Sequence, residues 1–88
     1  MVTNGSAEKY WARLEDKVKI FGVELRQRQV NSKTKTFEPE VALIGQSQTK
    51  TLVLPQSWME AWIDRNDTKS EIHVGTAVRD MAQKLRSA

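Results

Sequence analysis

The stretch KVKIFGVELRQRQV, Lys17–Val30, has the clearest residue pattern in the chain and is the basis of the predicted fold. Apolar and charged residues alternate over 17–20 and again over 23–28, and the parity shifts by one at Phe21-Gly22. Alternation with a period of two is typical of a strand with one apolar and one polar face. A glycine at the shift predicts a bulge that keeps the apolar side chains on one face. The sequence therefore predicts one long bent strand.

The polar face of this predicted strand is basic. Its positive charges continue into the turn that follows, and an aromatic ring lies among them. Basic side chains interleaved with an aromatic ring suit phosphate contact and base stacking. The candidate nucleic-acid-binding residues are Lys17, Lys19, Phe21, Arg26, Arg28, Lys33 and Lys35. The alternative interpretation is the solvated face of an antiparallel sheet, on which Glu24 dilutes the positive field.

Composition indicates one small globular domain. The chain has 88 residues, of which 39% are hydrophobic and 28% charged, and its net charge is +3. We expect a flexible tail over 1–5 and a single domain over 6–88. The absence of cysteine excludes disulfides and zinc sites with thiolate ligands. No apolar run suits a membrane span or a secretory signal, so we expect a cytoplasmic protein without a membrane partner.

The other elements follow from caps, turns and apolar spacing. Pro39 places its strand at a sheet edge or delays its start, because proline has no amide donor. The Ser57-x-x-Glu60 spacing predicts a capping box at a helix start. We expect a helix over 7–16 capped by Ser6, a turn over 31–34, strands over 36–44 and 50–54, a polar turn over 45–49, and a helix over 58–65 ended by Asn66-Asp67.

The last segment has two interpretations that the sequence leaves open. In one, Thr68 and Glu71 form a capping box and the whole segment is helical. In the other, residues 71–74 are extended, Gly75 is a break and Thr76 caps a helix that runs to about Arg86. Val74, Val78, Met81 and Leu85 define one apolar stripe at helical spacing, and the position of Ile72 on its opposite side is the ground for the second interpretation.

These elements predict an α+β fold. We expect a small three- to four-stranded antiparallel sheet packed against two or three short helices.

No pattern in the sequence indicates catalysis, a cofactor or a metal site. His73 is the single histidine, and Glu71 would share its face only if the segment were a strand. Glu38 and Glu40 are paired on a predicted edge strand, where charge discourages edge-to-edge pairing. No phosphate-binding glycine loop is present. We therefore expect a binding module and not an enzyme.

A protein partner or a homodimer is the alternative to nucleic acid. A short chain without disulfides often gains stability from association, and tryptophan is enriched at interfaces. The candidate partner-binding residues are Trp11, Val78, Met81 and Leu85. The same apolar residues would equally serve to dock the final helix on its own sheet.

The stretch from Gly45-Gln46-Ser47 to Trp62 resembles the swapped-hairpin DNA-binding domains of AbrB and MazE type. Those domains have a Gly-Asn-Ser turn, a strand ending in proline, a short helix and a further strand, for which residues 71–74 would stand here. The resemblance implies a dimeric DNA-binding regulator with Lys50 near the DNA. The chain departs from the pattern, because Gln46 replaces the asparagine and two extra residues precede the proline, so it is not assigned to that family.

Overall fold

The computed structural model describes residues 3–87, which form three helices and six short strands. In chain order these are α1 (Thr3–Ile20), β1 (Val23–Gln27), β2 (Val30–Asn31), β3 (Thr36–Phe37), β4 (Glu40–Leu43), β5 (Lys50–Thr51), β6 (Leu54–Pro55), α2 (Gln56–Asp64) and α3 (Thr68–Ser87). The predicted α+β class is confirmed. None of the described helices is long and apolar enough to cross a membrane.

The strands form two three-stranded antiparallel sheets where one sheet was predicted. Their orders are β1-β4-β5 and β2-β3-β6, so the chain passes between the sheets three times. One passage lies at Glu38-Pro39 and divides the strand expected over 36–44, because proline cannot donate to a ladder. Another lies at Leu52-Val53 and divides the strand expected over 50–54. The predicted polar turn over 45–49 connects β4 to β5.

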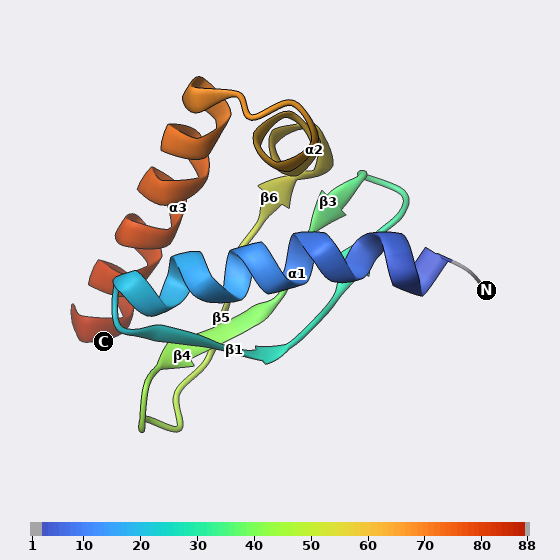
Figure 1. The fold of residues 1–88 in the computed structure, drawn as a ribbon. Coiled ribbons are helices and arrows are strands. Elements are labelled where there is room, and N and C mark those ends of the chain that lie inside the picture. Colours follow the sequence, from blue (N-terminus) through green and yellow to red (C-terminus); the bar gives the residue numbers. More distant parts are fainter. Residues whose placement is uncertain (1–2, 88) are drawn as a thin grey trace.

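The helices enclose the core against the two sheets. In Figure 1, α1 crosses in front of the strands and α3 stands along one side of them. Helix α2 is seen end-on near the top of the view. The core combines residues from all three helices and both sheets. Its buried members are Trp11, Leu14, Val18, Val23, Phe37, Val41, Leu52, Leu54, Met59, Trp62, Val74, Val78, Ala82 and Leu85.

The long strand predicted over Lys17–Val30 is wrong in its first part. Residues 17–20 belong to α1, and their buried member, Val18, continues the helical spacing of the buried Trp11 and Leu14. Ile20, which the strand interpretation placed in the core, is 72% exposed. An alternating run of four residues fits the period of a strand and also that of a helix. Residues 17–20 are helical because they continue the helix that precedes them.

The Phe21-Gly22 shift is the end of a helix and not a bulge. The Phe21 amide donates to the Val18 carbonyl, and the Gly22 amide to the Lys19 carbonyl, both at 3.0 Å. Gly22 has a φ of +77°, which is the left-handed conformation that glycine adopts after a helix. The chain then turns into β1, where a register shift against β4 lies between Leu25 and Gln27.

The N-terminal helix is longer than predicted at both ends. Because α1 begins at Thr3, residues 3–5 are helical and Ser6 lies inside the helix, not at its cap. Met1 and Val2, the rest of the expected tail, lie outside the described residues.

The predicted turn over 31–34 is confirmed, and the Asn31 side chain accepts hydrogen bonds from the amides of Lys33 and Thr34.

The predicted capping box at Ser57 does not form, because α2 begins one residue before it. The first amide of α2, that of Gln56, donates instead to the Lys35 carbonyl at 2.9 Å, and this bond joins α2 to the β2–β3 turn. Glu60 accepts from the Gln56 side chain at 2.8 Å. The predicted end of α2 at Asn66 is confirmed, since that residue has a φ of +53°.

The final segment is one continuous helix, and the interpretation with an extended stretch over 71–74 is wrong. Asp67 caps α3: its carboxylate accepts from the Ser70 amide at 3.0 Å and from the Ser70 hydroxyl at 2.7 Å. This cap replaces the predicted Thr68–Glu71 box. Gly75 lies within α3 without interrupting it. The further strand implied by the resemblance to the AbrB and MazE domains is therefore absent from 71–74.

Candidate partner-binding surface

The predicted basic residues do not lie on one continuous strand. Lys17 and Lys19 lie on α1, Arg26 on β1, Arg28 just beyond β1, and Lys33 and Lys35 in the turn between β2 and β3. Phe21 is half-buried, packs against the core, and accepts a hydrogen bond from Arg86 on its carbonyl. The set depended on a continuous strand, and the helix over 17–20 separates its members.

Three of these basic residues form ion pairs within the chain. Lys17 contacts Glu71 at 2.9 Å, and this pair joins α1 to α3. Arg26 contacts Glu24 at 2.7 Å, and Arg28 contacts Glu8 at 2.7 Å. Each pair neutralises a charge that the sequence alone would assign to a phosphate.

The predicted partner-binding residues are mostly part of this chain's own core. Trp11 is 5% exposed, Val78 1% and Leu85 5%, so three of the four do not present a surface. Val78 and Leu85 belong to the stripe by which α3 packs against α2, β4 and α1, and docking within the chain was the second use that the sequence allowed. Met81 differs from them, because it is partly buried and lines a groove at the surface.

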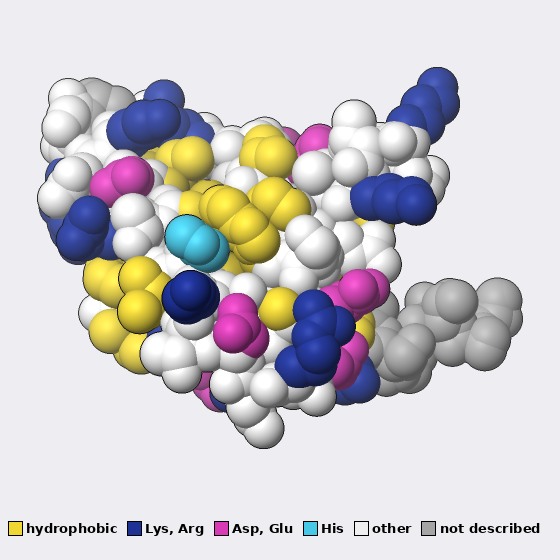
Figure 2. All heavy atoms as spheres, turned by 90° about the horizontal axis from the view of Figure 1, so that it is seen from above, with side chains coloured by type: hydrophobic (Ala, Val, Ile, Leu, Met, Phe, Trp, Pro, Cys, Tyr) yellow, Lys and Arg dark blue, Asp and Glu magenta, His cyan; other side chains and the backbone are white. Residues whose placement is uncertain are grey.

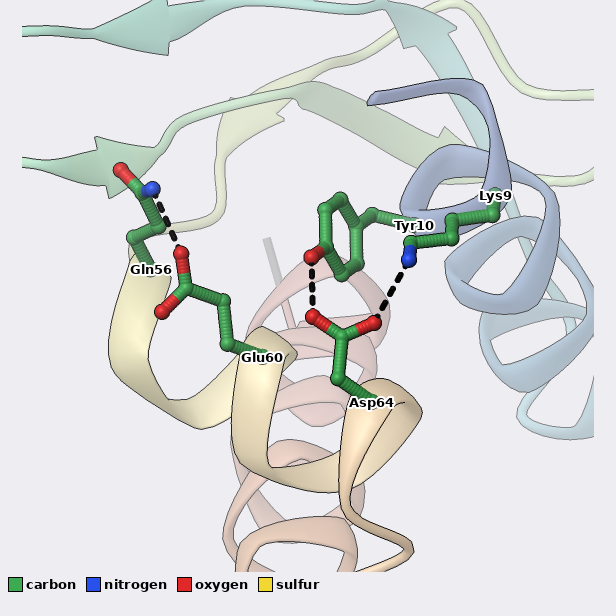
Figure 3. Close-up of polar contacts among 5 residues, drawn as sticks. All are labelled: Lys9, Tyr10, Gln56, Glu60 and Asp64. Atoms are coloured by element: carbon green, nitrogen blue, oxygen red, sulfur yellow. Dashed lines mark hydrogen bonds and ion pairs between the residues drawn. The ribbon is translucent and has the colours of Figure 1, made fainter. Parts of the chain in front are cut away.

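A polar cluster joins α1 to α2, and Figure 3 shows its members. Asp64 accepts a hydrogen bond from the Tyr10 hydroxyl at 2.5 Å and forms an ion pair with Lys9 at 2.7 Å. The bond to Asp64, helped by burial, raises the pKa of Tyr10 to about 12. The bonds from Lys9 and then Tyr10 lower the pKa of Asp64. The cluster fixes one helix on the other.

Trp62 strengthens the same α1–α2 contact. It is buried, and two cations of α1 lie over its ring, Arg13 at 5.3 Å and Lys17 at 5.4 Å from the ring centroid. A cation over an aromatic face is attracted by the ring quadrupole. These contacts hold α1 against α2, so the polar and aromatic residues between the two helices have a structural role.

His73 stacks on Trp58, with ring centroids 5.1 Å apart and an interplanar angle of 22°. Because residues 71 and 73 lie on different sides of a helix, Glu71 is turned away from His73 and toward Lys17. No group of three or more His, Asp or Glu side chains within residues 3–87 is placed to hold a metal ion. The His73–Trp58 pair is thus an aromatic surface contact between α2 and α3.

An apolar groove runs between α3 and the extended segment that joins β5 to β6. One end, a pocket of about 310 Å³, is lined by Leu52 and Val53 from the segment and by Ala77 and Met81 from α3. Val53 is 52% exposed there. His73, Ala77 and Met81 follow one another at helical spacing on the same face of α3, so the apolar surface extends toward Trp58. Figure 2 shows hydrophobic side chains gathered beside the histidine.

The other end of the groove is polar and carries two lysines. It is lined by Lys50, Asp80, Gln83, Lys84 and Ser87, and it shares Asp80 and Lys84 with the apolar end. Asp80 also lies 3.7 Å from Arg79, which partly balances its charge. Apolar side chains thus line the first end only, Asp80 and Lys84 line both ends, and Lys50 adds a positive charge at the second. We call the whole surface, from Val53, Ala77 and Met81 to Lys50 and Lys84, the α3 groove.

Of the residues in the α3 groove, the sequence analysis had singled out only Met81 as partner-binding. The signal for Val53 was present in the run TLVL, where alternation turns Thr51 and Val53 away from the buried Leu52 and Leu54. The position of α3 beside this segment was not predictable, because it depends on the crossing between two sheets.

Comparison of the chain with protein-family models, curated proteins and solved structures found no match.

Proposed function

We propose that the chain is a non-enzymatic protein-interaction module that binds its partner through the α3 groove. The observation that carries the proposal is the apolar end of the groove, where the half-exposed Val53 meets Ala77 and Met81 between two different elements. Single exposed apolar residues are ordinary on protein surfaces, whereas a concave apolar site with a charged rim is typical of a binding site.

The arrangement of charge favours a protein over nucleic acid. Nucleic-acid binding without a specific fold motif requires a continuous positive groove or stripe that follows the phosphates. Here Lys17, Arg26 and Arg28 are paired with carboxylates on separate elements. In Figure 2 the Lys and Arg side chains are spread over the view and are not gathered in one patch.

Nucleic-acid binding is the second candidate, and one observation favours it. Lys33 and Lys35 are exposed together on the turn between β2 and β3, which projects beyond its short strands. Two lysines on a turn would contact a backbone and would not read bases. This candidate therefore predicts weak binding that falls steeply with salt.

Site-specific photo-crosslinking tests the proposal. The photoreactive p-benzoylphenylalanine replaces Val53 in the groove or Ile72, a matched apolar residue of α3 that is 60% exposed outside the groove. Irradiation is done in cells that express the chain naturally. We expect a discrete protein adduct from position 53, none from position 72, and loss of the adduct when Ala77→Glu or Met81→Glu is added. Circular dichroism confirms that the variants fold.

Three results would contradict the proposal. One is an adduct of equal yield from both positions. Another is an adduct that survives both groove substitutions. The third is crosslinking to nucleic acid alone, with loss of the product on Lys33→Glu/Lys35→Glu, which would establish the second candidate.

A further inference from the structure

The α3 groove has the dimensions of a short extended peptide. On α3 it runs from Ala77 to Ser87, and ten helical steps of 1.5 Å make about 15 Å. An extended chain advances about 3.3 Å per residue, so four or five residues fill that length. The opposite wall is itself extended and runs from Lys50 to Val53. A helix laid in the groove would be about 10 Å wide, whereas a strand continues the geometry of this wall.

The wall offers backbone groups to such a strand. β5 is the last strand of its sheet and has β4 on one side only. Thr51 is the partner of Glu40, and the adjoining ladder bond runs from the Leu52 amide to the Pro39 carbonyl at 2.9 Å. In antiparallel pairing this bond marks Glu40–Thr51 as a non-hydrogen-bonded pair. The amide and carbonyl of Thr51 therefore point away from β4, to the open edge of the sheet.

The two ends of the groove differ in the side chains that they accept. Val53, Ala77 and Met81 line one end, Lys50 lines the other, and Lys84 lies between them and lines both. Val53 and Lys50 are three residues apart, which is about 10 Å along an extended chain. A strand beside β5 would place an apolar side chain at one end and a carboxylate at the other, about three positions apart.

We infer that the α3 groove binds an extended segment of another protein, carrying an apolar residue and an acidic residue about three positions apart, which adds as a strand to the open edge of β5. Strand addition is a recurrent mode of peptide recognition, in which backbone bonds give affinity and alternate side chains give specificity. The inference rests on the proposed function and specifies the partner.

Charge argues against a second copy of this chain as the occupant. Pairing of two identical β5 edges would bring Lys50 and Lys84 of one copy close to the same residues of the other. Lysine on an edge strand discourages such self-pairing, and the same charge attracts an acidic strand. The chain as a whole carries a net charge of +3, which adds to the attraction.

A random peptide library displayed on phage, selected on the full chain, tests the inference. We expect the enriched peptides to share an apolar and an acidic residue about three positions apart. One enriched peptide, made synthetically, is then titrated into the ¹⁵N-labelled chain. Strand addition predicts slowed hydrogen exchange at the Thr51 amide, because a new backbone bond protects it. Thr51→Pro removes that donor and leaves the bonds to β4 in place, so it should weaken binding.

Matched charge variants complete the test. Lys50→Glu/Lys84→Glu should raise the Kd about tenfold or more, because the peptide carboxylate then meets like charge. Lys33→Glu/Lys35→Glu makes the same change in net charge on the distant turn, and we expect its Kd within about twofold of the original, since screening weakens distant charges.

The inference is overturned by enriched peptides without an acidic residue, by an equal loss of affinity in both double variants, or by binding that leaves exchange at Thr51 unchanged. It is also overturned if selection on the original chain enriches nothing beyond selection on Val53→Glu. None of these results touches the proposed function, which fails only in the crosslinking experiment. A groove-specific adduct with a second copy of the chain would support a protein-binding function and overturn the acidic partner.

Discussion

Helix α3 has two apolar flanks, one buried in the core and one that lines the groove at the surface. On one flank, Val74, Val78, Ala82 and Leu85 are at most 5% exposed and pack in the core. On the other, Ala77 and Met81 are only partly covered, and Lys84 lies beside them in the groove. Two neighbouring residues of α3 lie on different flanks, because Ala82 is buried in the core and Met81 lines the groove. Apolar character alone therefore does not reveal which face of a helix a protein buries.

The largest expected effect tests the core flank. Leu85→Ala removes a buried side chain and leaves a cavity, so we expect the free energy of unfolding to fall by about 2–5 kcal/mol. Ile72→Ala, on the exposed side of the same helix, should change it by less than about 0.5 kcal/mol. Urea unfolding followed by circular dichroism measures both. Equal losses in the two variants would show that the flanks are not distinguished as described.

Gly75 and Gly22 should respond to alanine in opposite directions. Gly75 lies within α3 and nothing would crowd an added Cβ, so Gly75→Ala should stabilise the fold by about 0.5–1 kcal/mol. Gly22 has a φ of +77°, so Gly22→Ala should destabilise it by about 1–2 kcal/mol. Thermal unfolding checks both signs. A loss of stability in Gly75→Ala would support a break in the helix at that residue.

The contact between α1 and α2 should contribute to the pH dependence of stability. The folded pKa of Tyr10 is raised from 10.0 to about 12, so its contribution is complete below pH 10 and is lost as the pH rises from 10 to about 12. Tyr10→Phe should lose less than about 1 kcal/mol at neutral pH and should weaken this alkaline loss. Tyr10 is the single tyrosine, so tyrosinate absorbance reports its titration directly. A midpoint at the ordinary value would contradict the bond to Asp64.

At acid pH, stability should change with pH in the opposite direction and should fall as the pH falls. Asp64 and Asp67 have folded pKa values below 3.8, the first because of bonds from Lys9 and Tyr10, the second because of bonds from Ser70. Their contributions are present above pH 3.8 and are lost as the pH falls below it. Asp67→Asn should therefore flatten the dependence of the melting temperature on pH in that acid range. An unchanged pH dependence in that range would argue against Asp67 as the cap of α3.

The smallest expected effect on stability tests the groove flank. Val53→Glu changes a side chain that is half in solvent, so the free energy of unfolding should move by less than about 0.5 kcal/mol. The same substitution should abolish binding of a peptide selected on the groove, because it places a carboxylate in the apolar pocket. Ile72→Glu is the control and should leave that binding intact. A large loss of stability in Val53→Glu would mean that Val53 belongs to the core.

Local chemistry made several elements predictable. The turn at Asn31 and the end of α2 at Asn66 follow from side chains that bond their own backbone or tolerate a positive φ. The α+β class follows from the mixture of periods along the chain. By contrast, Lys17–Ile20 fits both periods, and four residues are too few to choose between helix and strand without knowledge of their neighbours.

The sequence by itself determined the class of the fold and several of its turns, because these depend on short-range conformation and on the periodicity of apolar residues. Only the tertiary structure decided that the strands divide into two sheets and that the predicted basic residues lie on several elements, three of them paired with carboxylates. It also decided that α3 lies beside the open edge of β5. The physical reason is that ion pairs such as Lys17–Glu71, and a groove that joins residue 53 to residue 81, depend on how distant segments pack, which no local pattern specifies.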